Sequence, residues 1–434
     1  MGVIVNLLLI YFKKIFLPII VLLMYCQPAL AMSIELSLED SIALTFRNNP
    51  ALQIVEARKE QSGWAVKEAQ SNKDLSVDYI HTDMRSSAPP SWTSSRVEVS
   101  PYNNFSNQIT ASIPLYTGGK IENTINQAKL GLKVSQLEIT ATKQNLKLET
   151  SMGYYNVLQT KTLLEIAKQT VDDFDAHLKR VQQMYKTGVV PWHDVLQTKV
   201  KLANAENTLV RAQNDYDLAI YSLNKTMGLP LRSEIKLIEP LAYQKFAFSL
   251  DDLTEYGLAK RPEMAQYEAN VKIGQAQIKI AQSEQRPKVM LSGAMAWDDN
   301  DFAGTENRDW TAMLITQVNL FDSGNTKAKI KQAQSSVMVA QEQARQTQDN
   351  ISLEISDTYL SLKEAEKRIA TNKVAVEEAS VNFDIAQRAY SAGVSTNLDV
   401  MDAELALNQA KTNYTNSMFD YNTSKARLDK AIGM

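Results

Sequence analysis

Apolar residues recur at alternating intervals of three and four along several long segments of the chain. The clearest runs lie between residues 195 and 223 and between residues 400 and 428, and residues 171–185 share the spacing. Such a seam is typical of helices that pack as a coiled coil. We therefore predict a mainly helical chain. The helices expected in the first half cover residues 38–71, 120–186 and 190–228.

Four shorter stretches alternate apolar and polar residues, as half-buried strands do. They lie at residues 75–79, 105–116, 289–297 and 310–320. Such stretches suit membrane-spanning strands, which need about 9 to 11 residues. Lipid does not tolerate an open sheet edge and a barrel needs at least about eight strands, so several chains would have to close one barrel. The alternative is a soluble sheet of four amphipathic strands.

The chain also repeats itself, which points to an ancient duplication. Residues 113–228 align without a gap with residues 318–433, so that Gly188 falls on Gly393. Each half has the order short helix, β-hairpin, long helix, turn and helix. The predicted parts are a first repeat at residues 32–228, a linker at residues 229–249 and a second repeat at residues 250–434.

The N-terminus has the parts of a secretory signal peptide, predicted to cover residues 1–31. Lys13 and Lys14 precede an apolar run that ends at Cys26, and an Ala-Leu-Ala site ends at Ala31. This order of a basic pair, an apolar run and small residues predicts export, with cleavage after Ala31. Lipidation of Cys26 is the alternative, but Tyr25 stands where that processing favours a small residue.

Composition argues against an enzyme or a nucleic-acid-binding protein. The formal net charge is -3 without a basic block, and the chain has one cysteine and three histidines. Gly118-Gly119-Lys120 lacks the rest of a phosphate loop, and there is no His-Glu-x-x-His motif. We therefore expect no catalytic residue, no metal site, no cofactor and no nucleic-acid partner. A secreted coiled-coil structural protein without a pore would fit the heptads, but not the hairpins.

Two pairs of turns carry a family resemblance. They are the strand-to-helix turns Tyr116-Thr-Gly-Gly119 and Phe321-Asp-Ser-Gly324, and the helix-to-helix turns Tyr185-Lys-Thr-Gly-Val189 and Tyr390-Ser-Ala-Gly-Val394. In order, spacing and duplication, the chain resembles the TolC-like outer-membrane efflux protein family over essentially its whole mature length. The resemblance implies an α+β fold, with a transmembrane β-barrel in outer-membrane lipid that takes four strands from each chain of a homotrimer. It also implies a long α-helical barrel in the periplasm.

The same resemblance implies a duct that docks to a periplasmic adaptor and an inner-membrane pump. The resemblance does not decide whether the cargo is a drug, a metal ion or a protein. Adaptor docking would then fall on the six turn residues Thr187, Gly188, Val189, Ala392, Gly393 and Val394.

Two acids match those that ring the closed entrance in this family, namely Asp399 and Asp402. A ring of carboxylates selects cations, and crowding of like charge should raise some of their pKa values. Asp399 can alternatively be a first-turn acid that the helix dipole favours, since Asp194 is its repeat partner. Asp402 has Gln197 as its repeat partner, so we favour a pore role there.

The resemblance also implies a gate that joins the two helix-to-helix turns. Tyr390 and Asp194 match the family's gate tyrosine and acid. Ser395 stands where the family has a basic residue, so this gate departs from the pattern.

Overall fold

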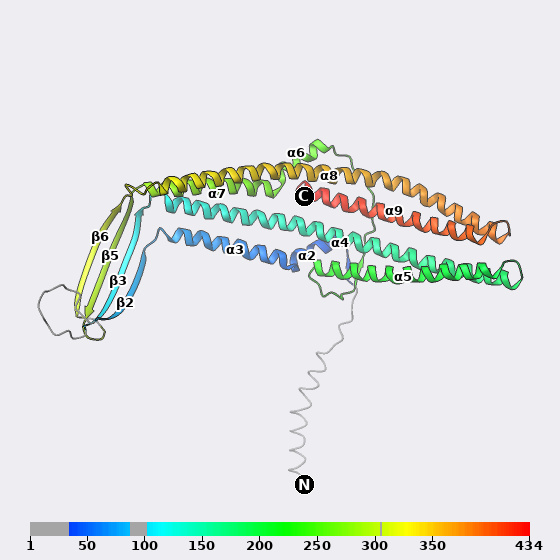
Figure 1. Ribbon diagram of the computed structural model, residues 1–434, viewed down its shortest axis with the longest axis horizontal. Coiled ribbons are helices and arrows are strands. Elements are labelled where there is room, and N and C mark those ends of the chain that lie inside the picture. The colour runs from blue at the N-terminus through cyan, green and yellow to red at the C-terminus, as the bar shows by residue number, and fades with distance from the viewer. Residues whose placement is uncertain (1–33, 87–101, 304–305) are drawn as a thin grey trace, which may run out of the picture. The chain divides into compact units, whose positions relative to one another are not determined.

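The computed structural model describes residues 34–86, 102–303 and 306–434, which form long helices and one four-stranded sheet (Figure 1). The predicted signal peptide and its cleavage site at Ala31 lie outside the described residues. Within the described ranges, no helix is both long enough and apolar enough to cross a membrane.

Four long helices come in two matched pairs. α4 (Lys120–Lys186) and α8 (Asn325–Ser391) have 67 residues each, and α5 (Trp192–Thr226) and α9 (Asn397–Ala431) have 35 each. The predicted long helix is confirmed at both ends, and the equal lengths agree with internal duplication.

The helix predicted over residues 38–71 is instead two helices, α2 (Leu38–Asn48) and α3 (Pro50–Ser71). A proline has no N–H and disfavours the helical conformation in the residue before it. Asn49 is accordingly extended, and its Oδ1 accepts a hydrogen bond from the Ala51 N–H at 2.8 Å. The second repeat has the same break, between α6 (Leu250–Lys260) and α7 (Pro262–Gln282), which a 3-10 turn follows (η1, Ser283–Gln285).

The four predicted strands form one antiparallel sheet in the order β2-β3-β5-β6. Their bounds are β2 (Ser76–Ser86), β3 (Tyr102–Tyr116), β5 (Lys288–Asp299) and β6 (Asn307–Gln317). The last strand ends at Gln317, three residues before the predicted end. β3 pairs with β5, so the hairpins of the two repeats meet in one sheet whose edges are β2 and β6.

A second, two-stranded sheet was not predicted. β1 (Ile34–Leu36) pairs in parallel with β4 (Ile235–Leu237), which lies in the predicted linker. Leu36 and Ile235 are buried in one cluster with Val157 and Leu223. The linker is therefore anchored on the helices. Three-residue strands are too short to give a periodic signal in the sequence.

The chain divides into two compact units by its own packing. Among the described residues, the turn unit comprises residues 34–48, 149–243 and 367–423, and it holds both helix-to-helix turns. The sheet unit comprises residues 49–148, 244–366 and 424–434. Each unit takes segments from both predicted repeats. The repeats visible in the sequence are thus not the compact bodies of the fold.

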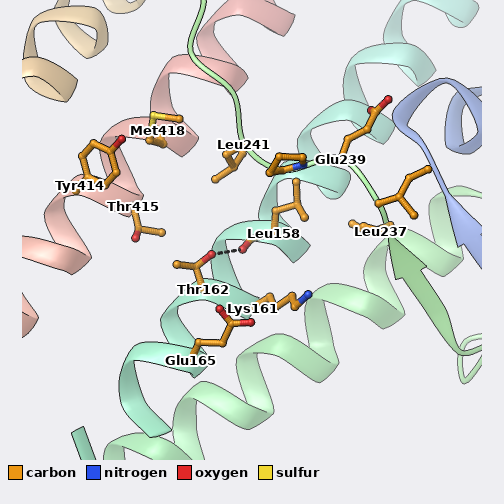
Figure 2. A pocket seen from close by; sticks show the side chains of 12 residues that line it. Leu158, Lys161, Thr162, Glu165, Leu237, Glu239, Leu241, Tyr414, Thr415 and Met418 are labelled. Carbon is orange, nitrogen blue, oxygen red and sulfur yellow. Dashed lines mark hydrogen bonds between the residues drawn. The ribbon is translucent and has the colours of Figure 1, made fainter. Parts of the chain in front are cut away.

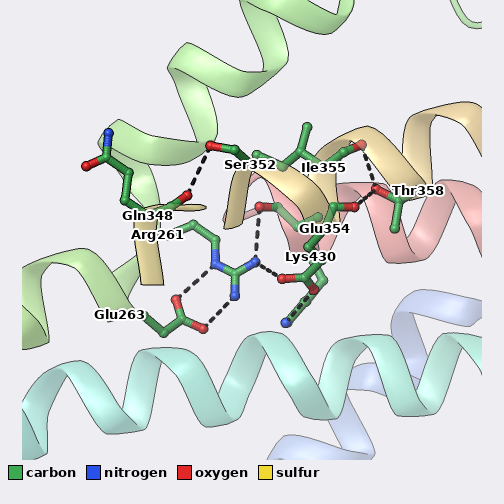
Figure 3. Close-up of polar contacts among 9 residues, drawn as sticks. Arg261, Glu263, Gln348, Ser352, Glu354, Ile355, Thr358 and Lys430 are labelled. Atoms are coloured by element: carbon green, nitrogen blue, oxygen red, sulfur yellow. Dashed lines mark hydrogen bonds and ion pairs between the residues drawn. The ribbon is translucent and has the colours of Figure 1, made fainter. Parts of the chain in front are cut away.

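A buried ion-pair network fixes helix ends in the sheet unit (Figure 3). The side chain of Arg261 is 5% exposed and binds both carboxylate oxygens of Glu263, at 2.9 and 3.0 Å. Its Nη1 donates to Glu354 Oε2 at 2.6 Å and to the Ala431 carbonyl at 3.2 Å. Lys430 donates to the other oxygen of Glu354. One guanidinium therefore ties the α6–α7 junction to α8 and to the end of α9.

Candidate functional site

The two helix-to-helix turns have the same backbone geometry. Gly188 and Gly393 have φ values of 76° and 75°, which glycine adopts without strain. The amides of Val189 and Val394 reach back to the carbonyls of Met184 and Ala389, at 2.9 and 3.0 Å. These bonds satisfy the carbonyls that a helix end leaves free. Both turns are therefore set by the local sequence.

The six residues predicted to dock an adaptor are all exposed. Val189 is 62% exposed and Val394 is 79% exposed, although both are apolar. A Cβ at either turn glycine would meet no atom within 4 Å. The turns thus leave room for a partner to approach the backbone closely. The docking role itself stays a prediction.

The two turns differ in what stands beside them. At the first, the exposed rings of Tyr185 and Trp192 lie 5.1 Å apart, and the Lys199 ammonium lies 5.6 Å from the Trp192 ring. At the second, the corresponding residues Tyr390 and Asn397 are buried. The duplicated turns therefore offer different surfaces.

Asp399 caps its own helix. Its Oδ2 accepts hydrogen bonds from the Thr396 N–H and hydroxyl, at 2.8 and 2.7 Å, and from the Ser395 hydroxyl at 2.8 Å. The Thr396 hydroxyl in turn accepts from the Asp399 N–H at 3.2 Å, which completes a capping box. The Thr396 N–H, then the two hydroxyls, hold the pKa of Asp399 below its usual value. Within one chain, this geometry supports the interpretation of Asp399 as a first-turn acid.

Asp402 is exposed one turn further along α9, clear of this cap. Ser395, which stands at the family's basic gate position, is engaged in the cap. The pore role of Asp402 and the gate role of Ser395 stay predictions.

The predicted gate pair does not form a hydrogen bond in the chain. Tyr390 is 2% exposed and packs in one cluster with Val195 and Val400. Its hydroxyl has no hydrogen-bond partner among the described residues. Burial raises the pKa of Tyr390, and the nearby negative charge of Asp194 raises it further. The two residues are thus within electrostatic reach, and their gate role stays a prediction.

A buried polar bridge beside Tyr390 was missed from the sequence. His177 of α4 donates through Nε2 to Asn397 Oδ1 at 2.7 Å. The Asn397 amide donates to Thr198 Oγ1 at 3.2 Å and to the Asp194 carbonyl at 3.3 Å. Burial lowers the pKa of His177, which favours its neutral imidazole. One signal was available: the repeat partner of Asn397 is Trp192, so the shared fold does not demand an amide there.

A hollow of about 570 Å³ lies elsewhere in the turn unit (Figure 2). It is lined by one face of α4, by the segment after β4 and by α9. Leu158 and Leu237 border it, and the Thr162 hydroxyl bonds to the Leu158 carbonyl at 3.0 Å. It contains none of the predicted site residues. Among the described residues, no group of three or more His, Cys, Asp or Glu side chains could hold a metal ion.

One face of the four-stranded sheet carries apolar side chains in several neighbouring rows, although its row of His81, Asn107 and Arg308 is polar. Directly paired residues point to the same side of a sheet. Tyr79, Ile109, Met295 and Trp310 are paired in one row, and Ile113, Leu291 and Leu314 in another. Trp310 is 78% and Leu314 63% exposed.

The opposite face of the sheet carries smaller and more polar side chains. The row of Ser76, Ser112 and Ser292 continues to Met313, and the row of Asp78, Thr110 and Ala294 continues to Thr311. The sheet therefore has one face suited to lipid and one suited to water.

Comparison with known proteins gives one consistent result. Residues 42–229 and 255–434 match the family described as "Outer membrane efflux protein". The chain is 22% identical to the outer membrane protein TolC of Escherichia coli over 67% of its own length and 62% of that protein's. It is 21% identical to the alkaline protease secretion protein AprF of Pseudomonas aeruginosa, over 66% of this chain and 60% of that protein. The matched region thus spans less than two thirds of these relatives.

Solved structures agree on the fold. The outer membrane channel CmeC of Campylobacter jejuni superimposes with a TM-score of 0.79 at 18% identity, covering 91% of this chain and 85% of that one. The outer membrane protein VceC of Vibrio cholerae superimposes with a TM-score of 0.77 at 18% identity. This match covers 91% of this chain and 96% of that one.

Proposed function

Because the chain belongs to the outer membrane efflux protein family, we propose that it is an outer-membrane channel, the exit duct of an efflux or type I secretion system. The observation that carries this proposal is the four-stranded sheet, which has an exposed apolar face and whose edge strands β2 and β6 have no further strand partner among the described residues. In lipid, unpaired strand edges are too costly to persist. We therefore propose that three copies pair edge to edge, and that the polar face lines the duct.

We place the helix-to-helix turns of this duct in the periplasm, where they meet an adaptor that links the duct to an inner-membrane pump. The support is their exposure: Val189 and Val394 present apolar side chains next to glycines that admit a close partner. Apolar residues that stay exposed in this way often mark interaction sites.

A photo-crosslinking residue at Val189 is expected to capture an adaptor protein in intact cells. The matched control is Val210, which is 69% exposed on α5 of the same unit but lies outside both turns. Mass spectrometry of the captured partner then shows whether the duct serves an efflux or a secretion system. Equal capture from both positions, or no capture from Val189 while the channel is in the outer membrane, would contradict docking at the turns.

The Asp402→Asn channel is expected to lose a large part of its preference for cations, because Asp402 is an exposed carboxylate that no cap engages. Reversal potentials across planar bilayers in a salt gradient measure this preference. Asp399→Asn is the control: its carboxylate is already bound by Ser395 and Thr396, so selectivity should change less. A larger effect at Asp399 than at Asp402 would reverse the assignment.

A further inference from the structure

Several buried polar atoms lie in the packing of α9 within the turn unit without a hydrogen-bond partner among the described residues. Glu404 of α9 is 1% exposed, and its Oε1 atom is one of them. Nδ2 of Asn408, one turn further along the same helix, is another. Nδ1 of His177 on α4 is a third. A buried polar atom without a partner costs stability, so such a group calls for an explanation.

Glu404 lies inside the interface between α4 and α9, away from the exposed turn. The two helices are antiparallel there: His177 bonds to Asn397, and Phe174 packs against Met401. Glu404 follows Met401 by three residues, so it continues the same face of α9. Its environment is therefore the packed interface.

The duplicated fold does not need an acid at this position. The repeat partner of Glu404 is Lys199, which is exposed and lies near the Trp192 ring. The same helix arrangement thus accommodates a solvated cation in one half and a buried acid in the other.

The surroundings of Glu404 favour its neutral form. Burial raises the pKa of Glu404 to about 8, the negative charge of Asp173 on α4 raises it as well, and Lys411 on its own helix lowers it. This stretch of α4 also carries Asp172, Asp175, Lys179 and Arg180. Burial lowers the pKa of His177, which favours its neutral form. No charged side chain of α5 or α8 in the described ranges is among the causes of the shift.

We propose that Glu404 is a proton-binding group that couples the packing of α9 against α4 to pH. The buried carboxyl holds its proton while the two helices are packed, and it releases the proton to water when they separate. The consequence for transport rests on the proposed duct function, in which movement of these helices would open the periplasmic end.

The direction of the pH effect follows from proton linkage. The packed state binds a proton with a pKa of about 8, and the separated state with the ordinary value of 4.5. The buried carboxyl therefore favours the packed state fully when the pH is below 4.5, and this stabilisation is lost as the pH rises towards about 8. Between the two values, the ratio of packed to separated helices falls by up to about tenfold per pH unit.

Infrared spectroscopy of the wild-type trimer in lipid tests the protonation directly. A band from a protonated carboxyl group is expected at pH 7 and should vanish as the pH passes about 8. The part of this band that comes from Glu404 should be absent from both Glu404→Gln and Glu404→Ala. The control is Asp429→Asn, because burial also raises the pKa of Asp429 in the sheet unit, and this variant should keep the Glu404 band. A wild-type spectrum without such a band at pH 6 would overturn the proposal.

Distance measurements test the coupling. Spin labels at Ala176 on α4 and Ala406 on α9, both exposed, report the separation of the helices in trimers diluted with unlabelled chains. The separated population should grow as pH rises from 5 to about 8 in the wild type and in Asp402→Asn, but not in Glu404→Gln. The same pH response in Glu404→Gln as in the wild type would overturn the proposal. A Glu404-dependent response in a trimer that conducts no ions would support the coupling and contradict the duct function.

Discussion

Replacing Leu314 by arginine is expected to prevent most of the protein from inserting as a folded trimer. Leu314 lies on the apolar face of edge strand β6, beside Leu291 of β5, and is 63% exposed. If this face meets lipid, an arginine near the middle of the bilayer costs about 2–4 kcal/mol. A trimer carries the substitution once in each chain, so the loss is repeated around the barrel. Urea-induced unfolding of the trimer in lipid vesicles measures this loss of stability.

The matched control for this prediction is Thr311→Arg in the same strand. Thr311 is paired with Ala294 and lies on the opposite, more polar face of the sheet. If that face lines a water-filled duct, the added charge is solvated and the trimer should insert nearly as the wild type does. Equal damage from the two substitutions, or greater damage from Thr311→Arg, would contradict the assignment of the faces.

Much of this architecture is visible in the sequence because long, regular elements leave a periodic signal. The heptads of residues 195–223 and the alternation of residues 105–116 predicted helix and strand correctly, and the duplication predicted the matched lengths of α4 and α8. The turn glycines were also predictable, since a helix that must reverse needs a residue tolerant of positive φ. These features depend on the local sequence.

The features that were missed depend on which residues meet in space. The pairing of β1 with β4 joins two three-residue segments that are far apart in the chain. The buried positions of Asn397 and Glu404 follow from helix packing, because an amide or an acid in a heptad carries no sign of its burial. The placement of Asp399 as a first-turn acid was visible as an alternative, and the geometry of the chain supports it.

Arg261→Met is expected to destabilise the sheet unit by about 3 kcal/mol, since breaking a buried ion pair leaves uncompensated charge. Arg261 is 5% exposed and binds Glu263, Glu354 and the Ala431 carbonyl. Its removal leaves the Glu263 carboxylate, which is 24% exposed, without the guanidinium. It also frees the end of α9 from the α6–α7 junction. Urea unfolding of the trimer in lipid, followed by circular dichroism of the helices, measures the change.

The same network predicts how stability depends on acid. Burial acts to raise the pKa of Glu354, but the hydrogen bonds from Lys430 and Arg261 outweigh it and hold the pKa below the ordinary value of 4.5. This stabilisation is therefore complete above that value and is lost as the pH falls through the lower pKa of the folded chain. Arg261→Met should weaken this acid sensitivity, because Glu354 then keeps Lys430 alone as its cationic partner.

The control for the network is Arg345→Met on α8, because it removes the same charge from an exposed pair. Arg345 lies 3.7 Å from Glu342, and both side chains are more than 70% exposed. Such surface pairs contribute little, so stability and its acid dependence should stay close to the wild type. If Arg345→Met lowers the free energy of unfolding as much as Arg261→Met does, the destabilisation at Arg261 comes from the change in net charge. If Arg261→Met alone is destabilised, the arginine acts through the helix ends that it joins.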